Sequence, residues 1–205
     1  MKTKLVGMSR VLVEVGENTK SVVERCNMKF NNKPNKMIEH KGQVYWISRS
    51  IAVVGLVFAR CKGETYVLIN KRGQGVPDYK GYWNLPCGYL DWNESAAEAI
   101  VREVYEETGL NLRYYFTDGI LDTHQPFYVA SDVNQNKQNV SLRYMFYFRV
   151  DELPKLTDKH NEEDETDEIG WFKLDEIEDK NFAFGHKEII KKWSVTASQL
   201  CCTVP

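Results

Sequence analysis

The sequence lacks any long hydrophobic run. No stretch approaches the roughly 18 apolar residues that a membrane-spanning helix needs. The first 17 residues, MKTKLVGMSRVLVEVGE, interrupt their apolar stretches with Arg10 and Glu14 too soon for a secretory signal peptide. We therefore expect a soluble globular protein in the cytoplasm, with no membrane as a partner.

Cysteine is scarce and unpatterned. The five cysteines are odd in number and form no CxxC pair, which excludes a disulfide framework and a zinc ribbon. Internal repeats and low-complexity tracts are also absent. We expect reduced, mostly buried thiols at these positions: Cys26, Cys61, Cys87, Cys201 and Cys202.

The composition that remains is that of a folded domain whose charge is unevenly distributed. With 205 residues, 42% apolar and 12% aromatic, the chain can fill the core of one sizeable domain and add a further segment. Residues 1–80 contain 15 Lys/Arg against 6 Asp/Glu, and residues 81–205 contain 12 against 23. A basic half suits phosphate or nucleic acid and an acidic half suits divalent cations, although solvated surface charge explains either. The first 80 residues do not alternate basic and aromatic residues as an RNA-binding module would, so nucleic acid is not the expected partner.

Hydrophobic patterning predicts strands on both sides of one helix. The residues up to 45 end in an Asn- and Lys-rich stretch that we interpret as an irregular connection. RSIAVVGLVFARC and TYVLINKR predict a hairpin across residues 62–64, followed by the loop GQGVPDYKGYW. WNLPCGYL is expected to be extended because Pro86 cannot lie inside a helix. Further strands are predicted in LRYYFTDGILDTH, VSLRYMFYFRV and IGWFKL, and a C-terminal helix begins at HKEIIKKW.

The segment between the strands, NESAAEAIVREVYEETG, predicts a helix with two different faces. Asn93 is the expected N-cap, and Gly109 is placed to end the helix in a left-handed conformation. At about 100° per residue, one stripe is apolar and the adjoining stripe is acidic. The apolar stripe consists of Ala97, Ile100, Val101 and Val104, and the acidic stripe of Glu103, Glu106 and Glu107. Strands around such a helix indicate an α+β layer fold.

The acidic stripe invites a functional explanation. A solvated helix face is the ordinary interpretation, but Glu103 is followed four residues later by Glu107 rather than by a lysine that would relieve the repulsion. That cost disappears if the carboxylates share Mg²⁺ or Mn²⁺, hard cations that prefer oxygen ligands. The helix also begins just after a turn at Gly88, where backbone can approach the same ion.

These residues resemble the signature of the Nudix hydrolases. The signature, GX5EX7REUXEEXGU with U apolar, matches from Gly88 to Leu110 at every specified position. The preceding WNLPCGYLD is similar to the family's W-x-L-P-G-G-x-x-E, with Cys87 where glycine is usual. The resemblance implies a Nudix-type α/β/α sandwich with a mixed β-sheet, in which the signature forms a metal-binding loop-helix-loop. We expect the Nudix hydrolase domain at residues 46–178, an N-terminal segment of unknown role at 1–45, and a C-terminal helix and tail at 179–205.

The resemblance also implies roles for individual residues. Glu103, Glu106 and Glu107 match the metal ligands of the family, and Arg102 and Glu94 match a pair that orients them. Gly88 and Gly109 match structural positions. The general base is open: Glu103 is one candidate, and a downstream loop supplies the base in several members of the family. Here that loop is NEEDETDE at residues 161–168, with Glu165 and Glu168 as candidates.

The expected substrate is a small nucleotide, a nucleoside diphosphate linked to a further group X. Pro126 resembles a proline associated with ADP-ribose-cleaving members, whereas Tyr128 resembles a tyrosine associated with dinucleoside polyphosphate members, so the two candidate substrate-binding residues disagree. An ADP-ribose-like substrate is favoured, cleaved with Mg²⁺ or Mn²⁺. The alternatives are a regulatory module that binds a nucleotide sugar and a sanitising nucleoside triphosphate pyrophosphohydrolase. The identity of X and a homodimeric state stay open.

Overall fold

The computed structural model describes residues 36–47, 51–115, 125–131, 133–134, 137–157 and 164–201. Within these ranges, no helix is long and apolar enough to cross a membrane. Cys61 is a buried free thiol and Cys87 a half-buried one, as predicted for both. Cys26 and Cys202 lie outside the described residues.

The predicted hairpin forms the centre of the fold. Strands β3 (Ile51–Cys61) and β4 (Glu64–Arg72) pair antiparallel, with Cys61 opposite Glu64. Lys62 and Gly63 connect them with φ values of 49° and 86°, a two-residue turn in which glycine adopts the left-handed backbone at no steric cost. This turn closes one end of the hairpin, and the glutamates predicted as metal ligands lie near its open end.

The main sheet is mixed, as predicted. Its strands follow the order β11-β4-β3-β10-β7, with β10 (Val140–Val150) parallel to β3 and the other pairs antiparallel. The outer strands are β11 (Thr166–Lys173) and β7 (Tyr128–Ala130). Two short strands extend the open end of the hairpin: β5 (Trp83–Asn84) pairs with β4, and β6 (Cys87–Tyr89) pairs with β3. A separate small sheet joins β8 (Val133–Asn134) and β9 (Lys137–Gln138).

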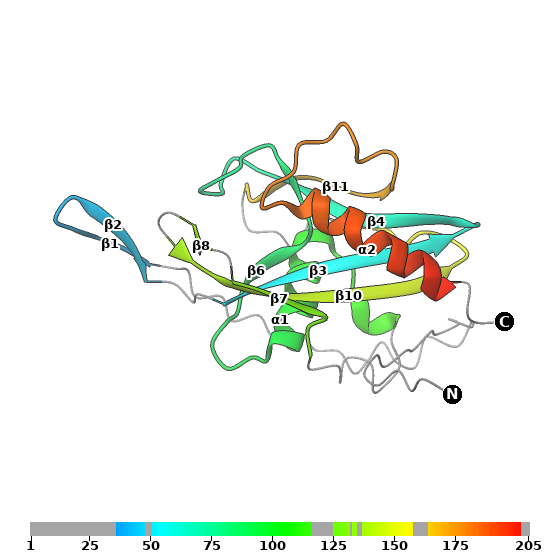
Figure 1. Ribbon diagram of the computed structural model, residues 1–205, viewed down its shortest axis with the longest axis horizontal. Coiled ribbons are helices and arrows are strands. Elements are labelled where there is room, and N and C mark those ends of the chain that lie inside the picture. Colours follow the sequence, from blue (N-terminus) through cyan, green and yellow to red (C-terminus); the bar gives the residue numbers. More distant parts are fainter. Residues whose placement is uncertain are drawn as a thin grey trace, which may run out of the picture.

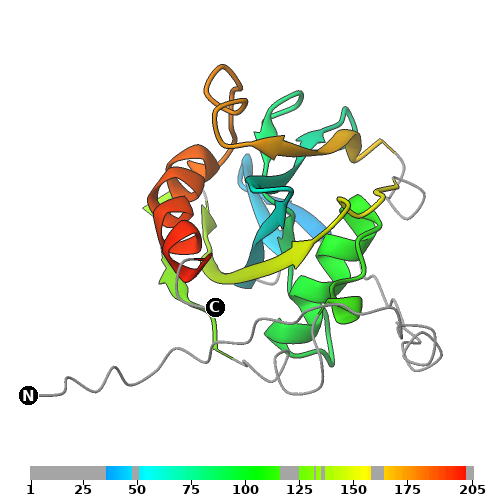
Figure 2. The same ribbon diagram turned by 90° about the vertical axis from the view of Figure 1, so that its right-hand side faces the viewer.

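Two helices cover opposite faces of the main sheet, which confirms the three-layer sandwich (Figure 2). Helix α1 (Ala96–Thr108) packs with Val53, Val57 and Leu68, and helix α2 (His186–Cys201) packs with the side chains that alternate with them, such as Leu56 and Phe58. This alternation follows from the two-residue period of a strand and divides the core into two apolar layers.

The start of α1 differs from the prediction. Ser95, not Asn93, is the N-cap: its Oγ accepts a hydrogen bond from the Glu98 backbone N–H at 3.2 Å, and the Glu98 carboxylate accepts one from the Ser95 N–H at 2.8 Å. Asn93 instead has a φ of 66° and belongs to the preceding turn. This reciprocal capping box satisfies more of the free N–H groups than a single Asn side chain can. The predicted end is confirmed, since Gly109 has a φ of 71°.

Two further segments differ from their predictions. Leu112–Tyr114 form a 3-10 helix rather than a strand, because the Asn111 side chain accepts a hydrogen bond from the Arg113 N–H at 3.1 Å and folds the backbone into a turn. The rest of that predicted strand, residues 116–124, lies outside the described residues. Within the segment expected to be irregular, β1 (Lys36–His40) and β2 (Gln43–Ile47) form a hairpin through a positive-φ turn at residues 41–42, and it projects from the main body (Figure 1).

Candidate metal and catalytic site

Strand β6 passes directly beneath the acidic stripe of α1. A Cβ atom at Gly88 would lie 2.2 to 2.4 Å from the carboxylate atoms of Glu103, closer than any real contact. The carboxylate therefore rests in a space that only glycine leaves open. This close approach is the physical reason for glycine at position 88, whose backbone φ is not in the left-handed region.

Arg102 gathers the acidic residues around one guanidinium group. It donates to both carboxylate oxygens of Glu94 from Nε and Nη2, at 3.0 and 2.7 Å. Its Nη1 donates to Glu103 at 2.8 Å and to Glu106 at 2.7 Å, and Nη2 also reaches the backbone carbonyl of Tyr89 at 3.0 Å. These contacts use the five N–H donors of an arginine, so the group is fixed in orientation. The predicted pairing of Arg102 with Glu94 is thus present in the structure.

The same network corrects one expectation from the sequence. The acidic stripe is not left without opposite charge, because Arg102 lies one residue before Glu103 and four residues before Glu106. Burial lowers the pKa of Arg102, but its hydrogen bond to Glu94 and the surrounding carboxylates outweigh this and raise it above its ordinary value. One cation is nonetheless shared among several carboxylates.

Glu107 is bound by the backbone of β6 rather than by Arg102. Its Oε2 accepts a hydrogen bond from the backbone N–H of Cys87 at 3.1 Å, and the Cys87 thiol in turn lies 3.4 Å from the Nδ2 of Asn84. Burial raises the pKa of Glu107 well above the usual value, and the neighbouring carboxylate of Glu103 raises it further. Burial likewise raises the pKa of Glu103 to about 8, against the pull of Arg102.

The donor set fits a hard divalent cation in its chemistry. Three carboxylates adjoin one another on α1, and the raised pKa values of Glu103 and Glu107 indicate a need for positive charge that Arg102 does not fully meet. As the side chains stand, no three His, Cys, Asp or Glu residues among the described residues are arranged to hold an ion, since Arg102 draws Glu103 and Glu106 to itself. Mg²⁺ or Mn²⁺ would be held by Glu103, Glu106 and Glu107 once Glu103 and Glu106 turn from the guanidinium.

The two loop candidates for the general base lie in different surroundings. The segment before β11 is attached to the GQG loop, because Gly73 N–H donates to the Glu165 carbonyl at 2.8 Å and Gly75 N–H donates to the Asp164 carbonyl at 2.7 Å. The Glu165 charge contributes to the raised pKa of the Glu107 carboxyl. Glu168 lies further along β11, exposed and paired with Lys71. The structure therefore brings Glu165 toward the acidic stripe.

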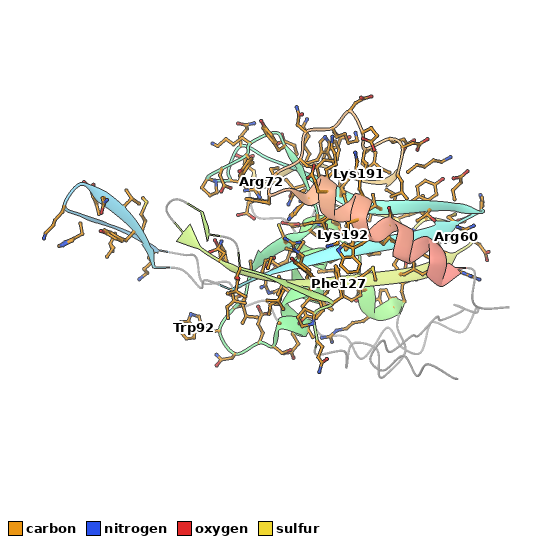
Figure 3. The ribbon with its side chains drawn as sticks, in the orientation of Figure 1. Arg60, Arg72, Trp92, Phe127, Lys191 and Lys192 are labelled. Carbon is orange, nitrogen blue, oxygen red and sulfur yellow. The ribbon has the colours of Figure 1, made fainter. Side chains whose placement is uncertain are left out.

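The predicted substrate-binding residues lie in and just before β7, away from the strand that underlies the acidic stripe. Tyr128 begins β7, and its ring centroid lies 5.0 Å from the Arg143 guanidinium carbon and 5.5 Å from the Nζ of Lys192 on α2. Half-buried Pro126 precedes it, and the intervening Phe127 packs on α2 (Figure 3). Tyr128 is thus on the α2 side of the fold, whereas the glutamates are on α1.

Sequence reasoning missed three polar residues where β4 ends and pairs with β5. Asn70 and Asn84 are buried and opposite each other on β4 and β5, and the Oδ1 atom of each lacks a hydrogen-bond partner. Arg72, two residues after Asn70, exerts a charge that lowers the pKa of Glu107. The only signal in the sequence was a polar residue at the end of each apolar strand, which is too common a feature to single out.

Comparison with known proteins identifies the family. The model of the NUDIX domain matches residues 49–193, well over half of the chain, so this protein belongs to the Nudix family. The family inferred from the sequence signature is thereby confirmed.

Two named relatives agree with this assignment. The chain is 25% identical over 165 residues to the ADP-ribose pyrophosphatase of Methanocaldococcus jannaschii, covering 80% of this chain and 85% of that protein. It is 29% identical over 93 residues to Nudix hydrolase 10 of Arabidopsis thaliana, covering 44% of this chain but only 34% of that protein. The names of both relatives support the predicted class of pyrophosphohydrolase.

Solved structures share the fold. The NUDIX domain of Shewanella oneidensis NrtR, complexed with ADP ribose, has a TM-score of 0.53 and 16% identity over 73% of this chain and 88% of that one. A bifunctional NMN adenylyltransferase/ADP ribose pyrophosphatase from Francisella tularensis, complexed with AMP and a Mn ion, has a TM-score of 0.56 and 22% identity over 87% of this chain and 45% of that one. At these identities the likeness establishes the architecture.

Proposed function

We propose that this protein is a divalent-metal-dependent hydrolase that cleaves the diphosphate linkage of a nucleoside diphosphate linked to X, with an ADP-ribose-like substrate. The observation that carries the proposal is the arrangement around Gly88. Glu103 lies against the glycine backbone, Glu107 accepts a hydrogen bond from the N–H of the preceding residue, Cys87, and Glu106 shares the Arg102 guanidinium with Glu103. A solvated helix face would not require a glycine in the neighbouring strand to make room for one of its carboxylates.

In this proposal the chain positions charge, and a bound cation would act as the Lewis acid that makes the substrate's phosphorus atom more electrophilic. Bound Mg²⁺ or Mn²⁺ would neutralise phosphate oxygens and lower the pKa of an attacking water. Arg102, fixed by Glu94, keeps Glu103 and Glu106 on the same side of α1. The helix offers no activated Ser or Cys, so water attacks phosphorus directly, without a covalent enzyme intermediate.

For the general base, Glu165 is the better-supported loop candidate. Its backbone is attached to Gly73, at the end of β4 nearest the acidic stripe, and its side chain is exposed and able to accept a proton. Glu168 has no comparable tether toward the stripe among its described contacts. Glu103 remains the alternative base, although its carboxylate is engaged by Arg102.

The substrate class is supported by the relatives. The relative that aligns with 80% of this chain is named an ADP-ribose pyrophosphatase, and one structural neighbour was solved with ADP ribose. A second candidate function is a module that binds a nucleotide sugar without cleaving it; the same neighbour, the NUDIX domain of NrtR, was solved with ADP ribose bound. The complete set of Glu103, Glu106 and Glu107 favours hydrolysis.

Hydrolysis of ADP-ribose in ¹⁸O-labelled water, with Mg²⁺ or Mn²⁺, tests the proposal. We expect AMP and ribose 5-phosphate, with the label in one of the two phosphate products, and slower cleavage of nucleoside triphosphates. The Glu106→Gln and Glu107→Gln variants should lose most activity and remain folded, whereas Glu152→Gln, at an exposed carboxylate after β10, should match wild type. Tight binding of ADP-ribose without any labelled product would favour the binding module, and full turnover in either stripe variant would reject the metal site.

A further inference from the structure

Three aromatic rings gather at the end of the sheet where β4 ends. Tyr79 and Tyr82 come from the loop between β4 and β5, and Phe184 comes from the segment before α2. The Tyr79 ring lies 5.6 Å from that of Tyr82 and 4.9 Å from that of Phe184, both in edge-to-face contact. The rings stay 47%, 40% and 39% exposed, respectively. Aromatic side chains that pack together in this way and still face solvent form a ready surface for another planar ring.

Two of these aromatic residues hold unfavourable backbone conformations. Tyr79 has a φ of 50° and Phe184 a φ of 57°, in the left-handed region that bulky side chains rarely adopt. Glycine would be favoured at both positions if the turns served only to connect strands. Strain of this kind gathers at ligand-binding segments, where the surrounding structure holds it in place.

The Arg72 side chain contacts one of the aromatic rings, and its charge also acts on Glu107 of the acidic stripe. The Arg72 guanidinium carbon lies 5.0 Å from the Phe184 ring centroid, and Asp78 anchors the group by accepting from Nη2 at 2.7 Å and, through its carbonyl, from Nε at 3.0 Å. Figure 3 shows Arg72 near the end of β4. A planar cation against an aromatic ring strengthens the surface and attracts anionic ligands.

The aromatic surface and the acidic stripe lie at the same end of the sheet. Arg72 ends β4, and Thr166 pairs with it directly after Glu165. Cys87, whose N–H holds Glu107, pairs with Val54 near the start of β3. Because β3 and β4 are antiparallel, the start of one and the end of the other coincide. A nucleotide with its diphosphate at the stripe would therefore bind at the end of the sheet that also contains the three aromatic rings.

We propose that Tyr79, Tyr82 and Phe184 form a stacking platform for the nucleobase of the substrate, with Arg72 as the residue that positions the Phe184 ring. This inference rests on the proposed hydrolase function and deepens it, since it places the base here rather than at Tyr128. Stacking on aromatic rings tolerates different bases, so the platform selects nucleotides over base-free diphosphates more than it selects one base over another.

Substitution by glycine distinguishes an effect of these rings on ligand binding from an effect on the stability of the fold. Tyr79→Gly and Phe184→Gly each remove a ring and relieve the positive φ, so the melting temperature should not fall much. We expect AMP to bind about tenfold more weakly in each variant and the KM for ADP-ribose to rise by a similar factor with kcat nearly unchanged. Ribose 5-phosphate should bind equally to all proteins. Tyr79→Phe should behave as wild type, as should Tyr45→Ala, whose ring on the β1-β2 hairpin is 46% exposed.

The outcomes distinguish this inference from the proposed function. Hydrolysis of ADP-ribose with an unchanged KM in both glycine variants would overturn the platform and leave the hydrolase standing. Platform-dependent binding of AMP in a protein that cleaves nothing would uphold the platform and overturn the hydrolase. Weakened binding of ribose 5-phosphate instead of AMP would assign these rings to X and overturn the nucleobase site, as would a Tyr128→Ala variant that alone loses AMP binding.

Discussion

A methyl group at position 88 should disable the site without unfolding the protein. In the Gly88→Ala variant, the Glu103 carboxylate, 2.2 to 2.4 Å from the new Cβ, must retreat by about 1 Å to reach an ordinary contact of about 3.5 Å. The backbone of Gly88 is not in the left-handed region, and the obstructing atoms are the end of a flexible side chain, so alanine fits once Glu103 has turned. A displacement of about 1 Å in a catalytic constellation can lower the rate by about 100-fold.

The stability of the same variant should change little. Alanine restricts the unfolded chain and so stabilises by roughly 0.4 to 1 kcal/mol, which offsets part of the weakened contact between Glu103 and Arg102. We expect kcat for ADP-ribose to fall by about 100-fold while the free energy of unfolding in urea stays within about 1 kcal/mol of wild type. Activity and stability are thereby separated in one substitution.

Two companion variants test the cause. Gly63→Ala, in the distant hairpin turn with φ at 86° and no atom within 4 Å of the new Cβ, should lose about 1 kcal/mol or more and retain kcat. Adding Glu103→Asp to Gly88→Ala shortens the obstructed side chain and should recover part of the lost rate. If Gly88→Ala keeps its kcat within about twofold, or if the double variant is no faster than Gly88→Ala alone, the close approach of Glu103 to Gly88 is not what the site requires.

The remaining predictions concern metal, acid and the GQG loop. Because burial raises the pKa of Glu103 to about 8, binding of Mg²⁺ must displace protons; metal should raise the melting temperature more at pH 8 than at pH 6, and an equal shift at both would reject Glu103 as a ligand. Burial lowers the pKa of His186 to about 3, so the folded protein keeps it neutral and loses about 1.4 kcal/mol per pH unit as the pH falls below about 6.5. His186→Asn, with an acceptor for the Leu85 N–H that His186 now binds at 3.0 Å, should flatten this slope in urea titrations at pH 7 and 5, and an unchanged slope would contradict the buried neutral imidazole. Gly73→Ala would place a Cβ 2.1 Å from the Asp164 carbonyl, and should lower kcat through displacement of Glu165; a kcat like that of wild type would remove Glu165 from the mechanism.

The local features of the site could be predicted from the sequence because they repeat along one helix. The 3.6-residue period places the acidic stripe beside the apolar one, and Gly109 ends the helix as expected. The N-cap was misassigned although its signal was present: Ser95 followed by Glu98 matches a capping box, which outweighs the single side chain of Asn93.

The contacts that position the site join residues distant in sequence, and no local pattern encodes them. The N–H of Cys87 reaches Glu107 only because β6 pairs with β3 beneath α1. The hydrogen bond from the Gly73 N–H to the Glu165 carbonyl joins the residue after β4 to the residue before β11. It therefore depends on the register in which these two strands pair. Short GQG motifs are usually loops, so this one carried no sign of its partner.

Residues with strained backbone conformations are concentrated at the end of the sheet that contains the acidic stripe. Among the described non-glycine residues with positive φ, two lie in tight hairpin turns, Lys41 and Lys62, where such angles are the ordinary solution. Of the others, Tyr79 and Phe184 belong to the aromatic platform, Asn93 lies in the turn before α1, and Asp164 accepts a hydrogen bond from the Gly75 N–H. The same end contains the unpaired amide oxygens of the buried pair Asn70 and Asn84, each of which costs free energy. Selection for stability alone would remove such features, since glycine or an apolar residue would fit better at each position. Their concentration next to the carboxylates, while the closed end of the β3-β4 hairpin is regular, therefore favours ligand binding as the constraint that maintains them.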